Sequence, residues 1–161
     1  ALAHEEYLHF IRTVLATDCA DLIDIEFFTA GAELPALIEE ARTAGAAVVC
    51  SSHDFTKTPP RAELVSRMVQ MQQAGADLPK LAVMPRCRTD VLELLAATAE
   101  MADLHPETPV ITMSMGALGA VSRLAGETFG SAMTFANPGR ASAPGQVSLD
   151  IVNEVLNALH L

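Results

Sequence analysis

The sequence predicts an α/β fold built on a parallel sheet, and three observations predict it. Short apolar runs rich in β-branched residues alternate with longer runs of helical periodicity. The apolar runs are mostly continuous rather than alternating, which is typical of a parallel sheet covered on both faces. The segments between them are long enough for the helical crossovers that parallel strands need. We expect one domain, residues 1–161.

The expected elements follow one another after an amphipathic helix in the opening residues. Strands are expected at residues 22–28, 46–51, 80–84, 110–115 and 131–136. Helices are expected at about residues 34–44, 59–74, 89–102, 116–125 and 148–160. Thr58 before Pro59 predicts a helix N-cap with proline in the first helical position, and Gly45 and Gly75 lie where helix C-caps belong.

The spacing of these strands fits either a doubly wound sheet or part of an eight-stranded β/α barrel. A doubly wound nucleotide-binding sheet has a glycine-rich turn after its first strand, but the turn at residues 29–33 contains one glycine. The GALG at residues 116–119 lacks the third glycine of the dinucleotide fingerprint, and the sequence has no Walker lysine. These absences favour the barrel.

The composition and the spacing of key residues exclude several classes of protein. A formal net charge of -10 repels phosphates, so we expect no nucleic-acid partner, and no apolar run approaches the roughly 20 residues that span a bilayer. The opening residues lack the positive charge of a signal peptide, and three distant cysteines build neither a disulfide framework nor a zinc motif. His4 and His9 are five apart, whereas the zinc-binding helix motif needs four. We expect a cytoplasmic protein.

Two positions in the first half carry candidate chemistry. Asp24 and Glu26 share one face of the first expected strand, because side chains alternate along a strand. A solvated edge explains them as well as a functional site does, but on the inside of a barrel they require a cationic partner. His53 follows the second expected strand, at the end where β/α active sites assemble, although a structural histidine is commoner there.

Lys80 opens the third expected strand, where a solvated lysine is the usual explanation. Alternatively, an apolar barrel interior disfavours its charged form and leaves an amine that attacks a carbonyl to form a Schiff base, with His53 as the proton-transfer partner. Met84, Met113 and Met115 lie near strand ends, where they line a pocket or fill the core.

The last part of the chain offers candidates for substrate binding. Arg123 makes a surface salt bridge or holds a substrate carboxylate in a bidentate fork. The loop ASAPGQ, residues 141–146, has the small-residue composition of a lid, with Ser142 and Gln146 as its polar contacts.

Together these segments resemble the type I 3-dehydroquinate dehydratases, the Schiff-base dehydratases of the shikimate pathway. No single piece is decisive, but the set is specific and keeps a consistent order and spacing from about residue 22 to the C-terminus. The matching pieces are LIDIE (22–26), SSHDFTKTPP (51–60), KLAVMP (80–85), ITMSMGALGAVSRLAGETFGS (111–131), TFA (134–136) and ASAPGQ (141–146).

The resemblance implies a (β/α)8 TIM barrel of which the chain supplies about the last five β/α units. It implies that Lys80 forms an imine with the ketone of 3-dehydroquinate and that His53 is the general acid and base. The products are 3-dehydroshikimate and water, on the route to chorismate and the aromatic amino acids, with no metal and no organic cofactor.

The resemblance also implies how the substrate is held. Arg123 binds the substrate carboxylate, and Ser142 and Gln146 contact the substrate as the lid closes. The protein is expected to act as a homodimer on this small molecule, with no membrane partner. The residues expected to line the pocket are Met113, Met115 and Phe135.

The chain departs from the family pattern because three N-terminal barrel strands have no counterpart. In the family these strands carry a glutamate that pairs with the histidine, so we expect His53 to lack that partner. Two expected strands, 22–28 and 131–136, become exposed edges, which predicts a fragment of a full barrel or assembly with a second copy. Two other functions stay open: another Schiff-base barrel enzyme such as a class I aldolase, and a non-catalytic barrel fragment that binds ligands or partners.

Overall fold

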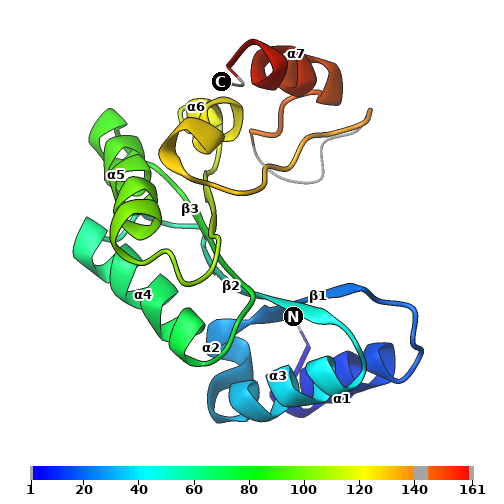
Figure 1. Cartoon of the computed structure of the whole chain (residues 1–161). Coiled ribbons are helices and arrows are strands. Elements are labelled where there is room, and N and C mark those ends of the chain that lie inside the picture. Colours follow the sequence, from blue (N-terminus) through cyan, green and yellow to red (C-terminus); the bar gives the residue numbers. More distant parts are fainter. Residues whose placement is uncertain (1, 140–144, 160–161) are drawn as a thin grey trace.

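The computed structural model describes residues 2–139 and 145–159, which contain a four-stranded parallel sheet in the order β1-β2-β3-β4. In Figure 1 the elements follow an open arc, from α1 and α3 through α4 and α5 to α6 and α7. The strands are β1 (Leu22–Glu26), β2 (Ala47–Asp54), β3 (Leu78–Val83) and β4 (Ile111–Ser114). The helices are α1 (His4–Leu15), α2 (Phe27–Ala30), η1 (Gly31–Glu33), α3 (Leu34–Thr43), α4 (Arg61–Gln73), α5 (Arg88–Leu104), α6 (Ala120–Leu124), η2 (Gly126–Phe129) and α7 (Leu149–Leu159).

The strand order separates the two folds that the sequence left open. Each strand pairs with the next strand along the chain, whereas a doubly wound sheet reverses its order within the sheet. Helices α3, α4 and α5 lie along the outer side of the arc (Figure 1). A sheet that winds in one direction with helices outside is the construction of a β/α barrel wall, so the predicted α/β class is confirmed.

The two faces of the sheet bury different side chains, because alternate residues point to opposite faces. The outer face sends Ile25, Cys50 and Leu81 into the larger core, where the helices cover them. The inner face carries a smaller apolar cluster that includes Met113 and Met115. Polar residues of the inner face therefore lie beside a short apolar wall rather than beneath a helix.

The predicted fifth strand, residues 131–136, is wrong. Only Ser131 forms a bridge, with Val110, and Ala132 donates its N–H to the Val110 carbonyl at 2.8 Å. Beyond that point the segment turns toward α6, where the Thr134 hydroxyl donates to the carbonyl of Arg123 at 2.9 Å. A contact with a helix terminus thus replaces the strand ladder.

The predicted N-cap at Thr58 is also wrong. Helix α4 begins at Arg61, and its N-cap position is Pro60. A proline pushes the residue before it out of the helical region, so two successive prolines delay the helix by two residues. The Thr58 hydroxyl donates instead to the carbonyl of Met84 at 3.2 Å. The C-caps are confirmed: Gly45 and Gly75 follow α3 and α4 with φ of 79° and 98°.

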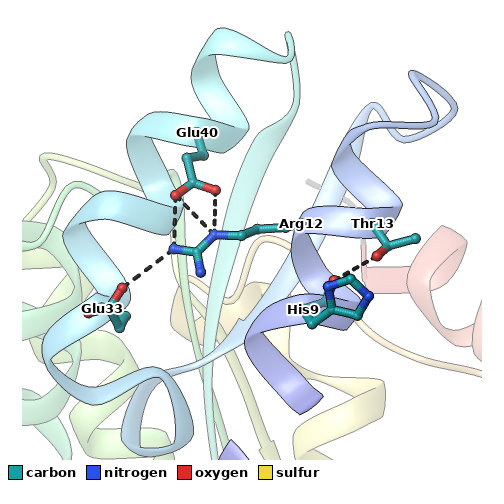
Figure 2. A network of polar contacts seen from close by, with 5 residues as sticks. All are labelled: His9, Arg12, Thr13, Glu33 and Glu40. Carbon is teal, nitrogen blue, oxygen red and sulfur yellow. Dashed lines mark hydrogen bonds and ion pairs between the residues drawn. The ribbon is translucent and has the colours of Figure 1, made fainter. Parts of the chain in front are cut away.

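Helix α1 is fastened to α3 by a forked ion pair. Arg12 donates from Nε to Glu40 Oε2 at 2.9 Å and from Nη2 to Oε1 at 3.0 Å, and Nη2 also reaches Glu33 at 3.4 Å (Figure 2). The hydrogen bonds to Glu40, which outweigh desolvation, raise the pKa of Arg12. Within α1, the Thr13 hydroxyl donates to the His9 carbonyl at 2.8 Å. Among the described residues, no helix has the length and apolarity to cross a membrane.

Candidate active site

Polar side chains of the inner face gather where β1, β2 and β3 run side by side. The register pairs Glu26 with Ser51 and Ser51 with Lys80. Because the strands are parallel and in register, Asp24 and His53 lie on the same face as these three residues. Three separate segments of the sequence thus contribute to one surface.

Lys80 is buried in this surface and paired with a carboxylate. It is 8% exposed, and its Nζ donates to Asp24 Oδ2 at 2.6 Å. The hydroxyl of Ser51, which is fully buried, donates to Asp24 Oδ1 at 2.5 Å. The solvated lysine at a strand entry is therefore wrong: Lys80 is the third residue of β3, and its neighbours enclose it.

His53 also has a carboxylate partner. Its Nδ1 forms a short contact with Glu26 Oε1, and its ring stacks on Phe55 with centroids 5.9 Å apart and an interplanar angle of 9°. His53 thus has an acidic partner within this chain, because the register of β1 beside β2 brings Glu26 to it. A carboxylate on Nδ1 fixes the ring and directs Nε2 to proton exchange.

Tyr7 of α1 supports the strand end that carries Glu26. Its hydroxyl accepts a hydrogen bond from the backbone N–H of Glu26 at 2.8 Å. Burial is the main cause that raises the pKa of Tyr7, so the hydroxyl stays neutral and keeps its own proton while its oxygen accepts. The α1 helix therefore holds the backbone of Glu26, whose carboxylate contacts His53.

Arg123 lies beyond β4 and is buried, so the surface salt bridge is wrong. It is 2% exposed, and burial lowers the pKa of its guanidinium. Its Nη1 donates to the Phe135 carbonyl at 3.4 Å and lies 3.6 Å from Met113 Sδ. The Phe135 ring centroid lies 5.0 Å from Lys80 Nζ. Phe135 thus connects the lysine and arginine positions.

A tight junction between β4 and α6 sets the position of Arg123. Ser122 Oγ accepts from the backbone N–H of Ser114 at 2.8 Å and donates to the Gly119 carbonyl at 2.7 Å. A Cβ at Gly119 would lie 2.2 Å from the Ser114 carbonyl oxygen, so only glycine permits this approach. The helix that carries Arg123 consequently starts in direct contact with the strand end.

The remaining predicted site residues fall into three groups. Met113 and Met115 are buried in the inner cluster, and Met113 Sδ lies 3.6 Å from Arg123 Nη1. Gln146 is half-buried, and its backbone carbonyl accepts from Asn137 Nδ2 at 3.5 Å. Ser142 lies outside the described residues. Ser51, which the sequence pattern did not single out, is the serine that holds Asp24.

The arrangement combines three chemical capacities on the inner side of the sheet. It has an amine with a counter-ion, an imidazole with a fixed tautomer, and a desolvated guanidinium whose positive charge favours an anion. The apolar wall of the inner cluster lies on the same face as the amine. Such a set suits covalent attack on a carbonyl followed by proton transfer on an anionic small molecule.

Comparison with known proteins finds close relatives. The family model described as Type I 3-dehydroquinase matches residues 1–161. A 3-dehydroquinate dehydratase of Clostridium kluyveri is 52% identical over 158 residues, which are 98% of this chain and 61% of that protein. One of Salmonella agona is 48% identical over 160 residues, 99% of this chain and 64% of that protein.

Solved structures agree. The type I 3-dehydroquinate dehydratase of Clostridium difficile, solved with covalently modified comenic acid, has a TM-score of 0.93 at 46% identity and covers 99% of this chain and 63% of its own. The enzyme of Geobacillus kaustophilus has a TM-score of 0.92 at 40% identity, covering 99% and 61%. These neighbours are TIM barrels, which confirms the predicted barrel class, and the chain spans less than two thirds of their length.

Proposed function

The chain belongs to the type I 3-dehydroquinase family, and we propose that it carries the imine-forming site of a 3-dehydroquinate dehydratase. The enzyme is a hydro-lyase that converts 3-dehydroquinate into 3-dehydroshikimate and water. It works in the cytoplasm, in the shikimate pathway to chorismate and the aromatic amino acids, as a homodimer. Its partner is this small molecule rather than a nucleic acid or a membrane.

The first step makes the substrate an electron sink. The Lys80 amine attacks the ketone carbon, the ketone oxygen leaves as water, and a carbon–nitrogen double bond replaces the carbon–oxygen double bond. The imine is protonated, and its positive charge acidifies the hydrogen on the neighbouring carbon. Ile111, which pairs with Lys80 in the sheet, and the other apolar residues of the inner cluster keep bulk water from the imine.

The second step is the elimination. Nε2 of His53 takes the proton from the neighbouring carbon, and the electron pair moves to the imine nitrogen as an enamine. The same proton then goes to the hydroxyl on the next carbon, which leaves as water while the carbon–carbon double bond forms. Hydrolysis with one water releases the product and restores the Lys80 amine, so the net reaction releases one water.

Substrate binding falls to the arginine side of the site. The positive charge of the buried Arg123 guanidinium attracts the substrate carboxylate, and its planar fork suits two parallel hydrogen bonds to it. Phe135 lies between this point and Lys80, so one substrate can contact all three. Ser142 and Gln146 add polar contacts from the lid loop.

One observation carries the proposal: Lys80 is 8% exposed on the inner face, beside a carboxylate and one strand from the Glu26–His53 pair. A lysine with only a structural role gains little from that placement, because burying a charge is costly. The type I family match does not favour the aldolase alternative.

The chain offers a clean test because it contains two lysines, Lys57 and Lys80. Incubation with 3-dehydroquinate and borohydride is expected to add one reduced ligand to the wild type and to Lys57→Arg, as read by intact mass. Lys80→Met is expected to gain nothing while keeping the circular dichroism of the wild type. Adduct on Lys80→Met would reject the nucleophile, and no adduct on any folded variant would support the non-catalytic fragment.

The histidine assignment has its own test. Glu26→Gln keeps the shape of the side chain but removes the charge at His53 Nδ1. We expect turnover to fall by about 100-fold or more, in the range of general acid–base contributions, while borohydride still captures the imine. Equal loss of capture and turnover would contradict a role confined to the proton transfers. Glu107→Gln, which changes an exposed glutamate between α5 and β4, is the matched control.

A further inference from the structure

We infer that Asp24 is the counter-ion of the Lys80 nitrogen, first of its ammonium and then of the protonated imine, and that Ser51 positions Asp24 for this role. Only the role of Asp24 at the protonated imine rests on the proposed function; its role at the resting ammonium does not. Asp24 is thus assigned as a catalytic residue, because it touches the reacting atom, and Ser51 as a positioning residue.

The geometry carries the assignment. One oxygen of the Asp24 carboxylate lies 2.6 Å from Lys80 Nζ, and the other accepts the Ser51 hydroxyl at 2.5 Å. Both oxygens are therefore committed, which prevents the carboxylate from rotating away. Ser51 is fully buried between the two strands that carry the pair, so its hydroxyl cannot exchange this bond for water without moving β2.

No other carboxylate of the described residues forms an ion pair with Lys80. The other titratable and charged groups near the pair on the inner face are Glu26 on β1, His53 on β2 and Arg123 on α6. Tyr7 of α1 and Cys50 of β2 also interact electrostatically with Asp24, and both are neutral in their protonated form. Glu26 contacts His53, and Arg123 contacts Met113 and the backbone of Phe135. The charge at the lysine nitrogen is therefore balanced by Asp24.

The chemistry needs such a group twice. Before attack, the ammonium must lose one proton, and Asp24 is the acceptor in contact with it. During dehydration of the carbinolamine that same proton returns to the departing oxygen, which leaves as water, so no proton is gained or lost overall. After dehydration, the nitrogen keeps a positive charge as the protonated imine, and the carboxylate stabilises the cation that acidifies the neighbouring carbon.

The first experiment reads the resting pair without substrate. Limiting acetic anhydride at one fixed pH labels both lysines, and peptide mass spectrometry gives the labelling ratio of Lys80 to Lys57, an exposed lysine in the same molecule. In Asp24→Asn this labelling ratio is expected to rise several-fold, because the Lys80 nitrogen no longer donates to a carboxylate. Lys57 is expected to stay unchanged.

Three further variants and one control separate charge from shape. Asp24→Glu restores the charge and is expected to return the Lys80 to Lys57 labelling ratio most of the way to the wild-type value. Ser51→Ala is expected to raise the ratio less than Asp24→Asn does, and Ser51→Thr, which keeps a hydroxyl, to restore it. Asp21→Asn, at an exposed position before β1, is the control for loss of one negative charge and is expected to change nothing.

The second experiment reads the reaction. Turnover of 3-dehydroquinate by Asp24→Asn is expected to fall about 100-fold or more, the typical cost of removing a group that stabilises charge in the reaction. An unchanged Lys80 to Lys57 labelling ratio in folded Asp24→Asn overturns the counter-ion, whatever the turnover. A raised ratio in a chain that captures no 3-dehydroquinate supports the resting pair and rejects the proposed function instead, so the two failures are distinct.

Discussion

The β4–α6 junction predicts that Gly119→Ala damages both stability and substrate binding. The new Cβ would lie 2.2 Å from the Ser114 carbonyl oxygen and 2.4 Å from its carbonyl carbon, where ordinary contacts begin at 3.4 Å. Both atoms belong to the backbone at the end of β4, so no side-chain rotation relieves the clash. Helix α6 must move away from the strand by about 1.2 Å, and Arg123 moves with it.

The size of the effect follows from overpacking. Inserting a methyl group into a closed contact costs about 1 to 3 kcal/mol of unfolding free energy. For a chain of this size each kcal/mol lowers the melting temperature by about 2 to 4 °C, so we expect a decrease between about 2 and 12 °C. Displacement of Arg123 should raise KM for 3-dehydroquinate more than it lowers kcat, because the guanidinium acts in binding.

Gly139→Ala is the matched control. At this glycine no atom of the described residues lies within 4 Å of the position that a methyl group would take, and φ is not positive, so the same change meets no clash among them. There we expect no loss, or a gain of about 0.4 to 1 kcal/mol from the stiffer unfolded chain. Urea unfolding of both variants measures the difference. Equal stability of Gly119→Ala and Gly139→Ala would refute the close approach and the positioning of Arg123 that depends on it.

Two further predictions concern titrating groups. Iodoacetamide should alkylate Cys19 and Cys87 in the folded protein and Cys50 only after denaturation. The reason is that burial, and to a smaller extent the nearby carboxylates, raises the pKa of the Cys50 thiol to about 12. Peptide mass spectrometry that finds Cys50 alkylated in the folded protein would contradict this. Burial opposes ionisation of Asp54, but hydrogen bonds from Thr56 and neighbouring backbone N–H groups prevail and lower its pKa below 3.8. Because the folded-state pKa is lowered, the ionised Asp54 carboxylate stabilises the folded protein above about pH 3.8, and this contribution is lost as the pH falls through the folded-state pKa. The difference in unfolding free energy between wild type and Asp54→Asn, measured in urea, should therefore shrink below about pH 3.8, and a difference that widens there would contradict the prediction.

Local periodicity was sufficient to predict the four strands of the sheet and the helices that cover it, because a strand or helix is encoded largely within its own segment. The contacts across the sheet could not be predicted in this way. Glu26 reaches His53 only in the observed register, and a slip of one residue would turn Glu26 to the other face. The alternation that places Asp24 and Glu26 on one face was visible in the sequence, but the strand beside them was not.

The prediction of a fifth strand was wrong for a related reason. Residues 131–136 have strand-like composition, yet a strand needs a neighbour along its whole length, and here Thr134 bonds to the end of α6 instead. Lys80 was predicted at a strand entry, whereas β3 begins two residues earlier, and this small difference moves the lysine from solvent into the sheet. The environment of Lys80 thus depends on where β3 begins, and not only on its being a strand.

The placement of both acids on β1 gives α1 a role in the site. Asp24 and Glu26, the partners of Lys80 and His53, lie on a strand that pairs on one side only within the described residues. A strand with one neighbour has less support than a central one, so its position depends on what packs behind it. Helix α1 supplies that support through Tyr7, which accepts the Glu26 N–H, and through the Arg12 fork to α3. Loosening α1 should therefore weaken both carboxylate pairs together, although the mechanism assigns no chemical step to a residue of α1.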